Sequence, residues 1–302
     1  MFHRHIRRAR GAVLWAILAP LMATLLWVLA AGGAGAQSAE PRTVTFPSAD
    51  GKTTLTGYLF APAGRPKTAP AVVLMHGRGG AYLRRAKGNF SAVTLDKNLR
   101  EWAELWSAQG YWALVVDSFS ARGMAAGLPP VATDAGRTAG ETEDAIRPLD
   151  AYGALRYLRA SPRVKPDRVA LEGWSNGASA ALAAMNRDML SGMQATNGHG
   201  FRAALAFYPG CTAKNLGATY RPYAPVRIFF GGHDSPQAIA ACQKLAQAGK
   251  GAGGDIGVTV FDSASRDFDD PMRRRSDAEA DETATAEARK QAVALLGSAL
   301  EH

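Results

Sequence analysis

Short apolar runs of the kind that form β-strands recur along the chain from residue 44 onward. The first two runs alternate apolar and polar residues, and residues 48–51 between them have the composition of a turn. The later runs are continuously apolar, as expected for strands that are buried on both faces of a sheet. The predicted strands cover residues 44–46, 54–59, 71–75, 112–116, 169–171, 204–208, 226–230 and 256–260.

Apolar residues with helical spacing predict helices between several of these strands. Leu99, Trp102 and Trp106 fall on one helical face, and Gly110 follows as a C-terminal cap. Further helices are predicted at residues 151–158, 175–190 and 288–299. Two strands followed by repeated strand–helix units indicate an α/β fold with a mostly parallel, doubly wound sheet and helices on both of its faces.

Three long connections leave the carboxyl ends of the predicted strands, at residues 81–97, 118–141 and 211–224. Ligands of open α/β sheets bind beyond the carboxyl ends of the strands. Connections of this length in a compact domain are usually functional. We therefore expect the three connections to form the walls of a substrate site.

Residues 1–36 differ in composition from the rest of the chain, because they hold four arginines and no acidic residue. A basic head is followed by an apolar run at residues 12–31 and by Ala34-Gly35-Ala36, which is the pattern of an export signal. The alternative is an uncleaved membrane anchor, since about 20 apolar residues can span a bilayer. Pro20 and the A-x-A site favour cleavage. Either way, the domain of residues 37–302 is expected outside the cytoplasm, as a periplasmic, secreted or membrane-anchored protein.

The composition of the 302 residues narrows the class of protein. The 47% apolar content excludes global disorder. Outside residues 1–36 the excess of basic over acidic residues is small and dispersed, so no nucleic-acid partner is expected. The arginine run at 273–275 is followed by acidic residues, and we expect it to be a solvated approach to a helix rather than a nucleic-acid site. Two cysteines cannot form a structural thiolate–metal cluster, and no metal or organic cofactor is implied.

The sequence Gly173-Trp174-Ser175-Asn176-Gly177 is a G-x-S-x-G motif between a predicted buried strand and a predicted helix. In that context the motif forms a nucleophile elbow, a tight turn that exposes the serine hydroxyl at a helix N-terminus. Free N–H groups and the helix dipole there favour a developing anion. Ser175 is therefore the candidate nucleophile; the alternative is a glycine-rich turn in which Ser175 only caps the helix.

Residues 76–80, with the sequence HGRGG, end an earlier buried strand. A loop at this place can supply the N–H of Arg78, which together with the N–H of Asn176 would form an oxyanion hole. The alternative is a plain glycine-rich turn. His76 is expected to be structural rather than the general base, since it precedes Ser175 in the chain.

These motifs, together with others along the chain, resemble the dienelactone hydrolase family of α/β-hydrolases. The matching stretches span nearly all of residues 65–270 and lie at 72–80, 116–119, 122–123, 150–151, 168–177, 208–211 and 231–234. The resemblance implies an α/β-hydrolase fold and hydrolysis of a small-molecule ester or lactone through a covalent acyl-enzyme. Some family members use cysteine as the nucleophile, and this chain has Ser175 at that position.

The family carries its catalytic acid where this chain has Asp234, just after the strand at 226–230. The alternative is that Asp234 caps the helix that would begin near Ser235. The family's histidine is expected in a stretch like A-x-H-x-F-D, and residues 264–269 match it except that Arg266 replaces the histidine. A guanidinium group stays protonated in proteins and cannot accept the serine proton.

No other histidine is well placed to act as the general base. His302 is the last residue, and His199 should lie at the wrong end of its strand. His233 is beside Asp234 and could be recruited if its loop turned, so it is the possible alternative base.

Two further features bear on the site. In the family, an arginine near Arg122 can hold an anionic substrate group; the alternative is a structural salt bridge, for example with Asp117. If Arg266 points into the same pocket, the two arginines would favour an anionic ligand. In an exported protein Cys211 and Cys242 would form a disulfide worth about 3–4 kcal/mol, with buried free thiols as the alternative.

Two interpretations therefore remain open. In the first, the protein is an exported serine hydrolase of esters or lactones whose general base is unassigned. In the second, it is a catalytically silent relative that binds a small, anionic ligand in the ancestral pocket. The intact G-x-S-x-G motif favours the first interpretation, and Arg266 favours the second.

Overall fold

The computed structural model describes residue 1 and residues 40–128, 143–193, 199–211, 216, 220–273 and 277–301. From residue 40 onward these residues belong to one compact unit. The predicted export segment, with its apolar run at 12–31, lies outside the described residues. None of the helices in the described part of the chain combines the length and the apolar character that a membrane span requires.

The centre of the fold is an eight-stranded sheet with the order β1-β2-β4-β3-β5-β6-β7-β8. Strands β1 and β2, and then β2 and β4, pair antiparallel, whereas every other pair is parallel. This arrangement confirms the predicted mostly parallel α/β sheet. The strands are β1 (Arg42–Pro47), β2 (Thr54–Phe60), β3 (Ala69–Met75), β4 (Trp112–Asp117), β5 (Val164–Trp174), β6 (Ala204–Phe207), β7 (Val226–Gly231) and β8 (Ile256–Phe261).

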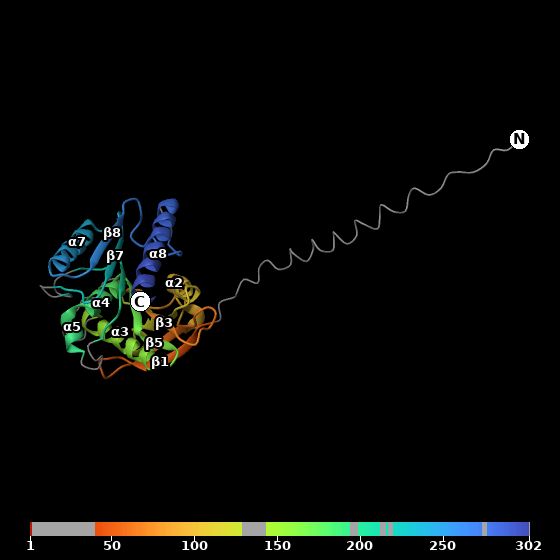
Figure 1. The fold of residues 1–302 in the computed structure, drawn as a ribbon, viewed down its shortest axis with the longest axis horizontal. Coiled ribbons are helices and arrows are strands. Elements are labelled where there is room, and N and C mark those ends of the chain that lie inside the picture. Colours follow the sequence, from red (N-terminus) through yellow and green to blue (C-terminus); the bar gives the residue numbers. More distant parts are fainter. Residues whose placement is uncertain are drawn as a thin grey trace. The chain divides into compact units, whose positions relative to one another are not determined.

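Helices cover both faces of the sheet, which is why the central strands are continuously apolar (Figure 1). On one face α2 (Lys97–Ala108) and α8 (Ala278–Glu301) meet through the Arg289–Glu101 salt bridge. On the other face α3 (Glu143–Arg159) packs against α4 (Asn176–Met185). Helix α7 (Pro236–Gly251) connects β7 to β8, and a right-handed connection places it on the α4 side.

The prediction of a single helix at 175–190 is wrong. Helix α4 ends at Met185, and a separate helix, α5 (Arg187–Gly192), follows. Asn186 between them has an extended backbone, with ψ 134°, and its side chain accepts a hydrogen bond from the N–H of Asp188. This local capping bond competes with helix continuation. The sequence analysis considered a helix start near Ser235 only as an alternative role for Asp234 and assigned no range to α7, although Ser235 and Pro236 are a standard helix start.

The loops at the carboxyl ends of the strands are partly described. Residues 81–97 contain the short helix η1 (Ala92–Thr94), and the 118–128 segment contains η2 (Ser120–Arg122). The 118–128 segment reaches the 76–80 loop, because the N–H of Leu128 donates to the carbonyl of Arg78 at 3.0 Å. Residues 129–142, 212–215 and 217–219 of the expected walls lie outside the described residues.

Cys211, which follows β6, and Cys242 of α7 form a disulfide. The prediction of a bridge is thus confirmed, and the alternative of two free thiols is wrong. The bridge fixes the chain just beyond β6 to the helix that follows Asp234, so two segments of the carboxyl rim are covalently joined.

Candidate active site

Ser175 occupies a strained turn between β5 and α4. Its backbone angles are φ 51° and ψ −115°, a conformation that costs free energy for any residue other than glycine. The turn is held by a hydrogen bond from the N–H of Ser175 to the carbonyl of Phe207 at 2.9 Å. A Cβ on Gly177 would lie 2.2 Å from the Met75 carbonyl oxygen. Glycine at this position therefore lets the first turn of α4 lie directly against the end of β3.

The Ser175 hydroxyl is not used as a helix cap. Ser175 is the N-cap residue of α4, but its side chain accepts no hydrogen bond from the helix backbone. The residue is partly exposed at the carboxyl rim of the sheet. The capping alternative thus does not account for the side chain, and the geometry is the one that a nucleophile elbow requires.

The 76–80 loop lies beside the Ser175 turn. A Cβ on Gly77 would lie 3.6 Å from the Cβ of Ser175. The loop folds back on itself, since the N–H of Gly80 donates to the Gly77 carbonyl at 3.2 Å and Gly80 has φ +87°. Arg78 and Asn176, the two expected oxyanion donors, therefore belong to two segments that meet at Ser175.

His76 is fully buried and supports this loop, as expected. Its Nδ1 donates to the Gly77 carbonyl at 2.7 Å, and its Nε2 accepts from the N–H of Ser118 at 3.2 Å. Burial and the nearby charge of Arg147 lower the pKa of His76 to about 3, although Asp117 acts in the opposite direction. The imidazole is neutral, with both nitrogens engaged by the backbone, so it is a structural group.

Arg266 stands between Ser175 and Asp234. Its Nη1 lies 2.6 Å from Oδ1 of Asp234, and its Nη2 donates a long hydrogen bond of 3.4 Å to Oγ of Ser175. The Asp234 side chain is 2% exposed, whereas that of Arg266 is 44% exposed. The guanidinium thus fills the position of a bridging imidazole, and it presents a donor to Ser175 where a base would present an acceptor.

Asp234 does not cap α7. The N-cap of that helix is Ser235, whose side chain accepts from the N–H of Ala238. The Asp234 carboxylate instead accepts from the N–H of Ser235 at 2.6 Å and pairs with Arg266. Asp234 is therefore oriented toward the residue at the base position, which is the arrangement expected of a triad acid.

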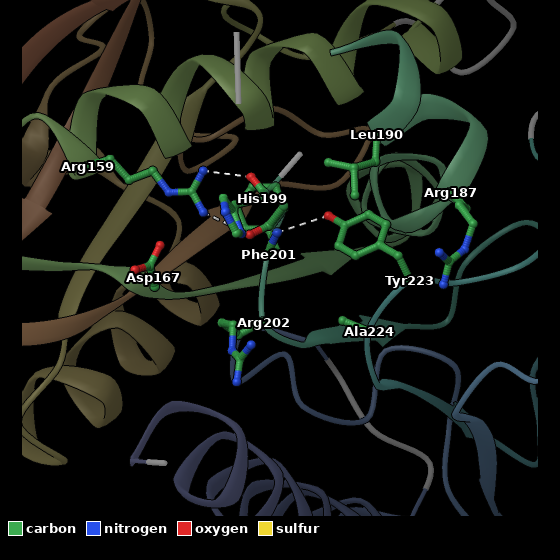
Figure 2. Close-up of a pocket in the computed structure, with 10 residues that line it drawn as sticks. Arg159, Asp167, Arg187, Leu190, His199, Phe201, Arg202, Tyr223 and Ala224 are labelled. Atoms are coloured by element: carbon green, nitrogen blue, oxygen red, sulfur yellow. Dashed lines mark hydrogen bonds between the residues drawn. The ribbon is translucent and has the colours of Figure 1, made fainter. Parts of the chain in front are cut away.

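The histidines lie elsewhere. His233 is exposed, its backbone N–H donates to the Ala264 carbonyl, and the structure places Arg266 rather than its ring next to Ser175. His199 precedes β6 and so lies at the amino end of the parallel strands, opposite Ser175, as predicted. There it lines a cavity of about 250 Å³ together with Arg159 and Tyr223 (Figure 2). His302 lies outside the described residues.

Arg122 is held by two carboxylates, of which Asp150 is fully buried and Asp50 is partly exposed. Its terminal nitrogens bond both oxygens of Asp150, at 2.8 and 2.9 Å, and Oδ2 of Asp50 at 3.0 Å. Burial would raise the pKa of Asp50, but hydrogen bonds from Lys52, Thr53 and Arg122 lower it to about 2. This is the salt-bridge alternative, with Asp150 and Asp50 as partners in place of Asp117.

A buried carboxylate behind the site escaped the sequence analysis. Asp269 is 1% exposed and accepts hydrogen bonds from Trp174, Tyr208, Trp102 and Asn98, at 2.7, 2.8, 3.0 and 3.2 Å. Burial raises its pKa, and these donors oppose the shift. Asp269 thus ties together Trp174 before the nucleophile, Tyr208 after β6, and the loop that carries Arg266. In the sequence, the only indication of this role was that Asp269 matches the final aspartate of the A-x-H-x-F-D stretch.

Over the described ranges, no three His, Cys, Asp or Glu side chains come together in a way that could hold a metal ion.

Comparison with known proteins places this geometry in a family. The sequence matches the family model described as the dienelactone hydrolase family over residues 55–300. No curated protein matches the sequence.

Many solved structures share the fold. One is a dienelactone hydrolase-like promiscuous phosphotriesterase from metagenomic libraries, with TM-score 0.61 and 21% identity over 85% of this chain and 97% of that chain. Another is the apo form of esterase 2 from Thermogutta terrifontis, with TM-score 0.62 and 18% identity over 87% and 96% of the two chains. At these identities the structures establish the shared α/β-hydrolase fold. The family model covers most of the chain, and the protein therefore belongs to the dienelactone hydrolase family, whose members are carboxylic-ester hydrolases.

Proposed function

We propose that the protein hydrolyses a small ester or lactone through an acyl-enzyme on Ser175. The observation that carries the proposal is the backbone of Ser175, which is strained at φ 51° in a turn that leaves the hydroxyl uncapped beside the 76–80 loop. Strain of this kind persists only where the surrounding structure enforces it, and it concentrates at functional sites. A purely structural turn would not require it.

In the proposed reaction, Oγ of Ser175 attacks the carbonyl carbon and the carbonyl π-electron pair moves to its oxygen. The N–H groups of Asn176 and Arg78 donate hydrogen bonds to the resulting oxyanion. The oxyanion electron pair then re-forms the carbonyl as the C–O bond to the leaving group breaks, and the departing alkoxide takes a proton from water. Water or hydroxide next adds to the acyl carbon, and Oγ of Ser175 leaves with the electron pair of its bond and regains a proton from water as the acid is released.

Arg266 changes the proton transfer in this reaction. Because a guanidinium stays protonated, the Ser175 proton goes to hydroxide or water rather than to the residue at position 266. The adjacent positive charge stabilises the alkoxide of Ser175 once it forms. Slow turnover is expected, with a preference for esters that have good leaving groups. Both arginines are paired with carboxylates, Arg122 with Asp150 and Asp50 and Arg266 with Asp234 and Asp267. Arg266 is the more exposed of the two and contacts Ser175, so it is the arginine that would meet an anionic substrate group.

The second candidate function is binding without turnover. It is favoured by the contacts that Arg266 makes with Asp234 and Ser175, because they engage both groups to which a catalytic histidine would hydrogen-bond. In this case the exposed guanidinium and the rim amides would hold a small carboxylate, and Ser175 would only be a hydrogen-bonding group.

We also propose that the protein is exported. The basic, apolar and A-x-A segments of residues 1–36 support this location, and so does the Cys211–Cys242 bridge, since disulfides persist in oxidising compartments.

The deciding experiment is the turnover of p-nitrophenyl acetate by the wild type, Ser175→Ala and Arg266→His. A wild-type rate that Ser175→Ala removes supports the hydrolase. Activity that appears only in Arg266→His supports the silent binder. Equal rates in all three variants would overturn both roles assigned to Ser175.

A further inference from the structure

Arg147 is a buried arginine near the start of α3, on a different element from every residue of the proposed machinery. Its side chain is among the largest that are fully buried, with 1% exposure. Its Nη1 donates to Oδ1 of Asn176 and its Nη2 donates to the carbonyl oxygen of His76, both at 2.6 Å. The guanidinium also lies over the ring of Phe119, 5.1 Å from its centre.

The two acceptors of Arg147 lie on the two segments that carry the proposed oxyanion donors. Asn176 is itself one donor residue, and His76 is two residues before Arg78. These segments meet without side chains between them, since a Cβ on Gly177 would lie 2.4 Å from the His76 carbonyl oxygen. Arg147 therefore bridges this junction with two short, charge-assisted hydrogen bonds from one rigid group.

We propose that Arg147 is a positioning residue that sets the separation of the two oxyanion donors; this inference rests on the function proposed above. The guanidinium fixes one peptide of the 76–80 loop relative to the first residue of α4. His76 extends the same control, because its Nδ1 holds the Gly77 carbonyl of the next peptide. Neither Arg147 nor His76 contacts Ser175 in this scheme.

Arg147 also places a permanent positive charge beneath the site. The guanidinium lies over the ring of Phe119 and donates to the backbone of His76, whose imidazole is neutral because burial and Arg147 lower its pKa to about 3. In such an environment a fixed charge stabilises a developing oxyanion more than it would in water. Arg147 thus acts on the anion through geometry and through charge, whereas Arg266 acts on the nucleophile itself.

The chain offers a matched control in the same helix. Arg159 lies about 18 Å further along α3. It donates to three backbone carbonyls, those of Pro166, His199 and Gly200, at 2.8, 2.7 and 3.0 Å. Figure 2 shows Arg159 beside His199. These bonds lie at the amino end of the strands, away from Ser175. Arg159→Met should therefore lower stability without changing catalysis.

The test compares Arg147→Met, Arg147→Lys and Arg159→Met, each in the wild type and in Arg266→His. The measurements are kcat and KM for p-nitrophenyl acetate after subtraction of the Ser175→Ala rate, together with Tm. Misplacing one oxyanion donor costs about 10²-fold or more in kcat. We expect Arg147→Met to lower kcat about 10–100-fold with KM changed less than about 3-fold. Arg147→Lys should recover little of this, since one ammonium cannot bridge both acceptors.

A double variant tests the route through Asn176. If Arg147 acts through its side chain, then Asn176→Ala added to Arg147→Met should lower kcat much less than it does alone. Full additivity would contradict the bridge.

Three outcomes would overturn the proposal. The first is a fall in Tm of Arg147→Met with kcat unchanged in the Arg266→His background. The second is a full recovery of kcat by Arg147→Lys. The third is the absence of Ser175-dependent turnover in both backgrounds, because no oxyanion would then form. If only the wild type lacks Ser175-dependent turnover, the proposed function is contradicted, but the effect of Arg147→Met can still be measured in the Arg266→His background.

Discussion

On one side of Ser175, glycines and buried polar groups fix the backbone; on the other, buried Asp234 pairs with Arg266, which is partly exposed to solvent. The first side consists of the 76–80 loop, Gly177, neutral His76 and buried Arg147. We call it the oxyanion side. The second, which we call the proton-transfer side, ends in a guanidinium whose side chain is 44% exposed.

The two sides differ in how easily a single substitution can alter them without disturbing the backbone. Altering the oxyanion side would require new backbone paths, because a Cβ on Gly177 or a lost bond to the His76 carbonyl disturbs packed main chain. On the proton-transfer side, a half-exposed residue can be exchanged while Asp234 keeps its orientation through the Ser235 N–H. If the proposed function is right, the described part of the chain holds a rigid frame that can stabilise an anion, and the residue between Asp234 and Ser175 is an arginine, which cannot accept a proton.

The comparison is tested most strongly by restoring a base. In Arg266→His, the imidazole would stand between Asp234 and Ser175 and could accept the serine proton. General acid–base catalysis typically contributes about 10²–10⁴-fold. We expect kcat for p-nitrophenyl acetate to rise about 100-fold or more. Arg266→Gln, which removes the charge and supplies no base, is the control. An equal gain in both variants would show that the charge of Arg266, rather than the missing base, limits the rate.

A second test damages the oxyanion side through its backbone. Gly177→Ala places a Cβ 2.2 Å from the Met75 carbonyl oxygen, so either α4 or the 76–80 loop must shift. We expect Ser175-dependent kcat to fall about 100-fold and the free energy of unfolding to fall by about 1–3 kcal/mol. Gly79→Ala in the same loop is the matched control, because its Cβ would meet no atom within 4 Å. Comparable rates for the two variants would contradict the rigid oxyanion side.

A third test measures how the Ser175-dependent rate varies with pH in the wild type and in Arg266→His. If no group near Ser175 titrates around neutrality, its deprotonation depends on hydroxide, and the Ser175-dependent rate should rise about tenfold per pH unit between pH 6 and 9. In Arg266→His the rate should level off above about pH 7, since an unperturbed histidine loses its proton near 6.5. A plateau in the wild type would instead identify a histidine base. Its loss in His233→Gln would assign that role to His233.

The smallest expected effect on the rate concerns Asp269, the buried carboxylate that joins Trp174, just before Ser175, to the loop that carries Arg266. Asp269→Asn replaces one acceptor oxygen by a donor that faces Trp and Tyr donors. Hydrogen bonds to a charged group are worth about 1.5–3 kcal/mol each. We expect a loss of about 3 kcal/mol in the free energy of unfolding by urea, with only a several-fold fall in kcat. Exposed Asp262→Asn is the control, and equal stability of the two variants would contradict the role of Asp269.

The sequence predicts those parts of the fold that depend on local pattern. Continuous apolar runs require burial on both faces, and this fixed the identity of the central strands. Elements whose ends depend on capping were less predictable. The helix at 175–190 is divided because the Asn186 side chain bonds to a nearby N–H, and α7 begins at Ser235 and Pro236 with few apolar residues to mark it.

The sequence by itself determined that Ser175 follows a buried strand within glycines, and that position 266 holds arginine. Both follow from chemistry local to the chain: only glycine fits such a turn, and only a few side chains accept a proton. The tertiary structure decided which charges meet. It brought Arg266 to Ser175 and Asp234, gave Arg122 to Asp50 and Asp150, and placed Arg147 across His76 and Asn176. These partners are 28 to 91 residues apart in the chain, and their encounter depends on how helices and loops pack over the sheet rather than on any local pattern.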